Sequence, residues 1–207
     1  MPESLIFDID GTLWDSTALV ARGYNAQLRD EGLEDHFVTP EDLKGLFGRT
    51  MTEIADVLFS HIPVPERYRL MERCMAREEA FLRGDPCRMG YPGVKETLTA
   101  LSGRHRLFIV SNSQKGYPEL VVEKLGLQGL FTDHLCFGDT GKSKGETIRR
   151  LMEKNGISDA VYIGDTQGDL EASVYAGIPF VFCRFGFGSP ERYDAAISGF
   201  SQLTTLF

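Results

Sequence analysis

Residues 4–14 read SLIFDIDGTLW, an apolar run that ends in two aspartates and breaks at a glycine. A short apolar run before a turn signal is typical of a buried strand in a parallel sheet. Asp8 is then expected at the carboxyl end of that strand, where open α/β sheets bind ligands. Period-two geometry predicts Asp8 and Asp10 on one side. Two carboxylates about 4 Å apart repel by about 4 kcal/mol at an effective dielectric constant near 20, which predicts a proton or a cation between them.

A local explanation of the same residues stays open at this point. Asp-Gly is a common turn signal, so Asp10 could serve the turn while Asp8 caps a helix. The choice depends on the residues at the ends of the other strands of the chain.

The composition limits the class of protein. The 207 residues are 42% hydrophobic and 25% charged, which suits one medium domain or a domain that carries an insertion. A formal charge of −8 disfavours nucleic acids and membranes as partners, but not a small anion held locally. No apolar stretch is long enough to span a bilayer, and the composition does not predict the oligomeric state.

The cysteines and histidines carry no metal or disulfide pattern. The cysteines are far apart with no Cys-x-x-Cys pair, and no secretory segment precedes Asp8, which predicts reduced thiols in a cytoplasmic protein. The four histidines lack metal-ligand spacing. The cysteines are Cys74, Cys87, Cys136 and Cys183.

The periodicity changes along the chain and predicts two domains. Residues 16–83 show helical periodicity without a convincing strand, and 65–82 fit one amphipathic helix. Turn residues at 84–86 and 90–93 then mark a boundary. We predict an α/β core of residues 1–15 and 86–207, interrupted by an all-helical domain of residues 16–85.

From Val94 onward, short apolar strands alternate with helical patterns. This alternation predicts a doubly wound parallel sheet with helices on both faces and right-handed crossovers, which the first strand joins. The predicted strands are 106–110, 134–137, 160–163 and 180–183, and the predicted helices are 94–102, 117–125, 144–155 and 169–176.

Polar residues come directly after two of the later strands. Ser111 and Asn112 could bind an oxyanion or cap the next helix, and alone they favour capping. Residues 141–143 read Gly-Lys-Ser, but a P-loop needs a glycine where Cys136 stands. Lysines in a loop are usually just solvated. A lysine that faces the acids, either Lys142 or Lys144, could instead hold a phosphoryl oxygen and offset the acidic charge.

A second acidic pair, Asp165 and Asp169, comes after the strand ending at Ile163. Favourable charge at a helix N-terminus explains such a pair adequately by itself. Four carboxylates at the ends of neighbouring strands would, however, repel strongly without a hard divalent cation, and an oxygen-rich site suits Mg²⁺. Together, the strand-end residues favour a chemical site over separate turns and caps.

These residues resemble the four ordered motifs of the haloacid dehalogenase superfamily, over the whole chain. The matching residues are Phe7–Leu13, Ser111-Asn112, Lys144 and Gly164–Asp169. The helical insertion and Tyr91-Pro92-Gly93-Val94 resemble the phosphoglycolate phosphatase-like and β-phosphoglucomutase-like branch, in which a helical cap comes after the first motif.

The resemblance implies a Mg²⁺-dependent phosphatase that acts on a small phosphate monoester. Asp8 would be the nucleophile, forming an aspartyl-phosphate, and Asp10 the general acid and base. The phosphoryl group would be held by Ser111, Asn112, Lys144 and backbone amides after Asp8, including that of Gly11. The metal would be held by Asp8, the backbone carbonyl of Asp10, Asp165 and, directly or indirectly, Asp169.

Two departures from the family pattern matter. Its lysine motif usually reads Lys-Pro, whereas Gly145 comes after Lys144, so Lys142 remains an alternative. The histidine that phosphomutases of this branch carry after the first motif is missing from residues 15–25, which favours a phosphatase and leaves a phosphomutase as the alternative. Asp10 disfavours dehalogenases and phosphonatases, in which this aspartate is replaced.

A phosphate-accepting signalling module is a third interpretation. Receiver domains also gather acids, a hydroxyl and a lysine around a parallel sheet. In receiver domains the acid that becomes phosphorylated comes after a later strand, and there is no long insertion. The position of Asp8 and the insertion therefore argue against this class.

For substrate recognition, the insertion offers Arg49, beside Gly48 at a break between helices, as a contact for an anion. A solvated arginine explains this residue at least equally well.

Overall fold

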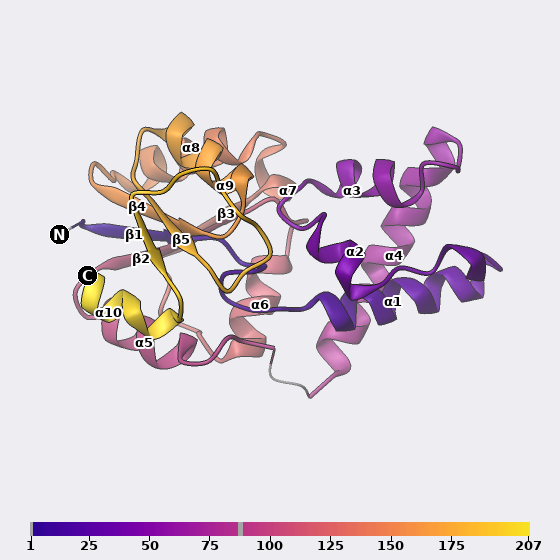
Figure 1. Cartoon of the computed structure of the whole chain (residues 1–207), viewed down its shortest axis with the longest axis horizontal. Helices are drawn as coiled ribbons and strands as arrows, with labels where there is room; N and C mark the ends of the chain where they lie inside the picture. Colours follow the sequence, from indigo (N-terminus) through magenta and orange to yellow (C-terminus); the bar gives the residue numbers. More distant parts are fainter. Residues whose placement is uncertain (1, 87–88) are drawn as a thin grey trace. The chain divides into compact units, whose positions relative to one another are not determined.

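The computed structural model describes residues 2–86 and 89–207 (Figure 1). Contacts within the chain divide it into two compact units. We call Met1–Asp15 with Arg88–Phe207 the core unit, and Ser16–Cys87 the helical unit. None of the described helices is both long and apolar enough to cross a membrane.

The core unit contains a six-stranded parallel sheet, as its alternating pattern predicts. The strand order is β3-β2-β1-β4-β5-β6, so the first strand lies in the middle of the sheet. Each neighbouring pair is parallel. The strands are β1 (Ser4–Phe7), β2 (Arg106–Ser111), β3 (Asp133–Cys136), β4 (Ala160–Gly164), β5 (Phe180–Cys183) and β6 (Ala195–Ile197).

Helices cover both faces of the sheet, which confirms the doubly wound fold. Helices α8 (Lys144–Asn155) and α9 (Gln167–Ala176) lie on one side, and α5 (Val94–Ser102) and α10 (Leu203–Leu206) on the other (Figure 1). Apolar residues from alternate strand positions pack under α8 and α9. They include Ile6, Phe108, Val110, Tyr162, Phe180 and Phe182.

The helical unit has its own apolar core. Tyr24, Leu28, Phe59, Leu70 and Cys74 are buried together there, beside other apolar residues of the unit. The amphipathic helix predicted at 65–82 is confirmed as α4. The helices are α1 (Thr17–Asp30), α2 (Pro40–Lys44), α3 (Met51–Leu58) and α4 (Val64–Gly84), with a 3-10 turn η1 (Glu34–His36).

Several short elements were not predicted from the sequence patterns. The apolar run predicted as a strand at 134–137 ends at Cys136, because Phe137 begins the one-turn helix α7 (Phe137–Thr140). Edge strand β6 and the terminal elements η2 (Phe200–Gln202) and α10 were also not predicted. Three or four residues are too few to show a hydrophobic period.

Candidate active site

Strand register places the predicted site residues at one edge of the sheet. Phe7, the last residue of β1, pairs with Ile109 of β2 and Ile163 of β4. The N–H of Asp8 continues this pattern by donating to the carbonyl of Ile163 at 2.9 Å. The residues at the carboxyl ends of the three central strands therefore lie together, as expected for a parallel sheet.

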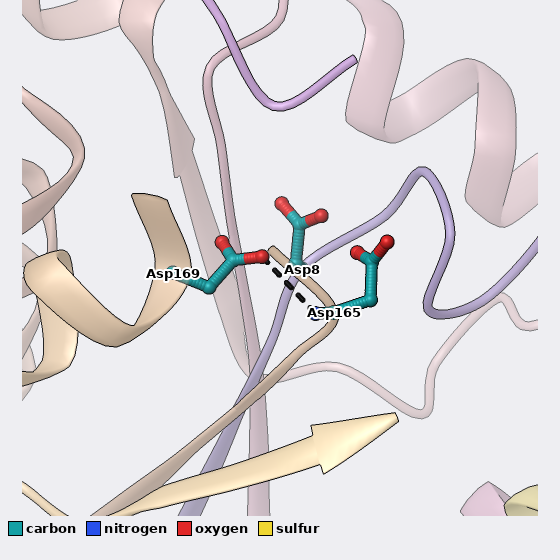
Figure 2. Close-up of side chains that lie close together, drawn as sticks. All are labelled: Asp8, Asp165 and Asp169. Carbon is teal, nitrogen blue, oxygen red and sulfur yellow. Dashed lines mark hydrogen bonds between the residues drawn. The ribbon is translucent and has the colours of Figure 1, made fainter. Parts of the chain in front are cut away.

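Three aspartates form the centre of this edge. Asp8 comes after β1, while Asp165 and Asp169 come after β4, with Asp169 in the first turn of α9 (Figure 2). Each offers a carboxylate oxygen, and these oxygens all lie within 4.8 Å of one another. All three residues are at most 2% exposed, so their charges are poorly solvated. Such a buried group of hard oxygen donors suits a divalent cation.

Lys144 joins two of the aspartates. Its Nζ donates to Oδ1 of Asp8 at 2.8 Å and to Oδ1 of Asp169 at 2.7 Å. Lys144 is the first residue of α8, whose start is fixed by a reciprocal capping box between Ser143 and Glu146. Lys144 is buried whereas Lys142 is exposed, so the structure brings Lys144, and not Lys142, to the acids.

Asp169 serves both the helix and the cluster. Its Oδ2 accepts hydrogen bonds from the N–H and the hydroxyl of Thr166, the N-cap of α9. The same oxygen accepts from the N–H of Asp165, the bond drawn in Figure 2. Oδ1 faces Lys144 instead. Asp169 therefore contributes one oxygen to the capping box of α9 and the other to the contact with Lys144.

Burial and neighbouring charges shift the pKa values of the three carboxyl groups in different directions. Burial raises the pKa of Asp8 to about 7, against the lowering effect of the Lys144 ammonium. Burial and the charges of Asp169 and Asp8 raise the pKa of Asp165 well above its usual value. Burial also opposes ionisation of Asp169, but Lys144 and the hydrogen bonds from Thr166 lower its pKa overall. One ammonium does not compensate three buried carboxylates.

Residues outside the expected set hold Asp165. The N–H of Phe187 donates to its Oδ2 at 2.7 Å, and the Thr12 hydroxyl donates to its Oδ1 at 3.4 Å. A Cβ atom at Gly11 or Gly186 would collide with the Asp165 carboxylate. Two glycines in Phe185–Gly188 could have indicated a loop that approaches other residues closely, but nothing in the sequence places this loop beside the end of β4.

Asp10 is not a member of the buried metal-binding group, although its charge contributes to raising the pKa of Asp8. Among the described residues, the group able to hold a metal through side chains leaves Asp10 out. Oδ1 of Asp10 instead accepts hydrogen bonds from the indole of Trp14 and the hydroxyl of Tyr117. The chain leaves the strand after Phe7, so the period-two argument does not describe Asp10. No motif in the sequence marks Trp14 or Tyr117 as a partner of Asp10.

The structure corrects two expectations for backbone and capping groups. The Gly11 N–H, expected to hold phosphate, donates to the carbonyl of Trp14 at 2.9 Å and closes the turn after Asp8. Ser111 and Asn112 do not cap α6 (Tyr117–Leu125), because its N-cap is Gly116 and has no side-chain cap. Ser111 is instead buried at the end of β2, where its Oγ accepts from the N–H of Ser113.

Arg49 belongs to the helical unit. It is exposed in the turn between α2 and α3, directly before Thr50, the N-cap of α3. Its N–H donates to the carbonyl of Leu46 at 3.2 Å. Gly48 has a φ of 92°, a left-handed conformation that favours glycine and breaks the helical path there.

A comparison with known families gives the site its context. Residues 5–183 match the family described as haloacid dehalogenase-like hydrolase. The chain belongs to this family. As a haloacid dehalogenase-like hydrolase of the phosphatase-like kind, it carries the buried group of Asp8, Asp165 and Asp169 that is typical of the family's magnesium site.

Individual relatives narrow the branch. A phosphoglycolate phosphatase of Agrobacterium fabrum is 31% identical, with 96% of this chain and 89% of the relative covered. One from Aquifex aeolicus is 28% identical, covering 88% and 85%. This haloacid dehalogenase-like hydrolase is therefore phosphoglycolate phosphatase-like.

Solved structures agree on the fold. A haloacid dehalogenase-like family hydrolase from Streptococcus pneumoniae has a TM-score of 0.82 and 16% identity. The match covers 100% of this chain and 98% of that one. At this identity the likeness shows the fold, including a helical insertion after β1.

Proposed function

We propose that this enzyme is a Mg²⁺-dependent phosphatase that hydrolyses a small phosphate monoester, with 2-phosphoglycolate as the first substrate to test. The observation that carries the proposal is the buried group of Asp8, Asp165 and Asp169 with Lys144 between two of its members. The phosphoglycolate phosphatases among its relatives support the substrate class.

Asp8 is the proposed nucleophile. Its carboxylate attacks phosphorus, the bond from phosphorus to the leaving oxygen breaks, and an aspartyl-phosphate forms on Asp8. Water then attacks the same phosphorus atom, and the bond to Asp8 breaks to release phosphate. Asp10 gives a proton to the leaving oxygen in the first step and takes one from water in the second.

Lys144 and the end of β2 are proposed to hold the phosphoryl group. An ammonium group has three N–H donors, and Asp8 and Asp169 account for two of those of Lys144. The third can be donated to a phosphoryl oxygen. Ser111 and Asn112 are proposed to bind this group from the end of the neighbouring strand β2.

The donor set fits Mg²⁺. Three buried carboxylates and one ammonium leave negative charge that a divalent cation would compensate. Asp8, Asp165 and the backbone carbonyl of Asp10 are the proposed ligands, and Asp169 supports the site either as a further ligand or through Lys144, to which its Oδ1 is bonded. When bound, the metal neutralises charge on the transferring phosphoryl oxygens.

The helical unit is the proposed cap, with Arg49 as its contact to a second anionic group of the substrate. Its separate apolar core supports its treatment as a domain of its own, corresponding to the predicted insertion of residues 16–85 in a core of 1–15 and 86–207.

We further propose that the enzyme acts on a phosphorylated metabolite in the cytoplasm. Cys74, Cys136 and Cys183 are free thiols buried in the structure, which suits a reducing compartment. Cys87 lies outside the described residues.

A substrate screen tests the proposal. Purified protein is incubated with 2-phosphoglycolate, sugar phosphates and p-nitrophenyl phosphate, with Mg²⁺ or with excess chelator, and released phosphate is measured. We expect phosphate release that requires Mg²⁺ and favours a small monoester. Isomerisation of a sugar phosphate without net phosphate release would indicate a phosphomutase instead, and unchanged hydrolysis in chelator would refute the metal assignment.

A further inference from the structure

One oxygen of Asp10 receives two hydrogen bonds from aromatic side chains. The Trp14 Nε1 donates to Oδ1 of Asp10 at 2.9 Å, and the Tyr117 hydroxyl donates to the same oxygen at 2.8 Å. The two rings pack edge to face with their centroids 5.9 Å apart. Two hydrogen-bond donors therefore hold the Asp10 carboxylate through its Oδ1 atom.

The backbone holds Trp14 in this place. Its side chain is fully buried, and its carbonyl accepts the Gly11 N–H, which closes the turn after Asp8. Trp14 also forms isolated β-bridges with Asp10 and with Gly90. A buried indole has one N–H donor and no acceptor, so it can only donate to the aspartate.

Tyr117 comes from a different part of the chain, the loop between β2 and α6. Tyr117 is the first residue of α6, and the helix is preceded by Gly116 at a φ of 88°. The loop before α6 lies close to Gly138, where a Cβ atom would collide with the backbone of Lys115, and the Gly138 N–H donates to the carbonyl of Ser113. Tyr117 is 4% exposed, so its hydroxyl has few alternatives in solvent.

We propose that Trp14 and Tyr117 are positioning residues for Asp10, which they hold by Oδ1 so that Oδ2 is the oxygen that carries the proton. The proposal rests on the proposed role of Asp10 as general acid and base. Because Trp14 can only donate, Oδ1 remains an acceptor whether Asp10 is ionised or neutral. The proton that passes to the leaving oxygen, and the one later taken from water, then both reside on Oδ2.

Orientation matters because proton transfer requires the donor oxygen within hydrogen-bond reach of the leaving oxygen. If the carboxylate could rotate freely, the unprotonated oxygen would face the leaving oxygen for part of the time. Small misplacements of reacting groups lower the rate of reaction. The effect on the phosphorylation step should appear in kcat/KM and depend on how much the leaving group needs a proton.

The test uses Tyr117→Phe and Trp14→Phe in the full chain, assayed with an alkyl phosphate and with p-nitrophenyl phosphate. Tyr117→Phe keeps the ring and removes one donor. We expect kcat/KM, which reports the phosphorylation step, to fall about tenfold or more for the alkyl phosphate and less than about threefold for p-nitrophenyl phosphate, whose leaving group needs no proton. Tyr68→Phe is the control, because Tyr68 donates to Asp56 within the helical unit. It should leave both rates unchanged.

An Asp10→Asn background separates positioning from general damage. If Tyr117 acts through Asp10, adding Tyr117→Phe to Asp10→Asn should cause no further loss, whereas a structural role would give additive losses. Equal losses on both substrates, additive losses, or a faster Tyr117→Phe enzyme would each overturn the proposal. Failure of the proposed function would look different, because the wild-type protein would then release no phosphate with Mg²⁺.

Discussion

The ammonium nitrogen of Lys144 lies 2.8 Å from Oδ1 of Asp8, although 136 residues separate the two in the chain. Both side chains are at most 5% exposed, so little water screens their attraction. Burying an ion pair costs solvation, and this pair gains a third member in Asp169, 2.7 Å from the same ammonium. The start of α8 is thereby tied to the residue after β1 and to the first turn of α9.

Replacing Lys144 by Met should impair both stability and catalysis. Removing one member of a buried ion pair typically lowers the free energy of unfolding by about 3–5 kcal/mol, because the remaining charges lose compensation. We also expect kcat to fall at least about 100-fold through loss of charge stabilisation at the phosphoryl group. Urea denaturation and steady-state assays measure the two effects. Lys142→Met is the matched control, and a comparable loss there would reassign the motif lysine.

Asp8→Asn should abolish turnover while preserving the fold. The substitution keeps the side-chain volume but removes the nucleophile. Circular dichroism should match that of the wild-type protein, and beryllium fluoride should protect the wild type, but not the variant, against thermal unfolding. Asp133→Asn, at the start of edge strand β3, is a control that should remain active. Normal turnover by Asp8→Asn, with deamidation excluded by mass spectrometry, would remove Asp8 from the mechanism.

Mg²⁺ should stabilise the folded protein, because only the fold brings the carboxylates of its proposed site together. We expect the Tm to rise with Mg²⁺ concentration in the wild type, and to rise much less in Asp165→Ala. The same variant should need more Mg²⁺ for half-maximal activity. Calorimetry of binding to the metal-free protein measures the affinity directly, and equal affinities would exclude Asp165 as a ligand.

The stability of the metal-free protein should fall as the pH rises. Burial raises the pKa of Asp8 from 3.8 to about 7 and also raises that of Asp165. The folded state then binds more protons than the unfolded state, so this contribution is present at low pH and is lost as the pH rises through about 7. Asp169, with its lowered pKa, acts in the opposite direction and only at lower pH.

Urea denaturation in chelator, at several values between about pH 5 and pH 8, measures this dependence. Asp8→Asn and Asp165→Asn should each make the curve flatter, and saturating Mg²⁺ should do the same. Stability that rises across this range in chelator would show that the carboxylates are already compensated.

Arg49→Ala should act selectively on substrates that carry a second anionic group. Loss of a charge-assisted hydrogen bond would lower kcat/KM for such a substrate by a factor corresponding to about 1.5–3 kcal/mol. Hydrolysis of p-nitrophenyl phosphate should be nearly unchanged. Arg69→Ala, an exposed arginine of α4, is the control. Equal losses on both substrates would indicate general damage to the helical unit, and no loss would leave Arg49 as a solvated side chain.

Much of the fold could be predicted because the relevant signals are local. The apolar run at Leu5–Phe7 and the later alternation predicted a parallel sheet, and the structure places five of its six strands where runs were found. The grouping of Asp8, Asp165 and Asp169 could be predicted from their places after strands, since all parallel strands end at one edge. Edge strand β6 carried no comparable signal.

Tertiary structure decided which groups meet. Local patterns left Lys142 and Lys144 equivalent, and only the start of α8 directs Lys144 to Asp8 and Asp169. Likewise, Trp14 and Tyr117 read as ordinary aromatic residues until the fold brings both to one oxygen of Asp10. Sequence alone determined the chemistry available at each strand end, because strand periods and turn signals are short-range. Which side chains contact one another depends on the strand register, on where helices begin and on which loops lie close together. These features arise only when distant segments pack together.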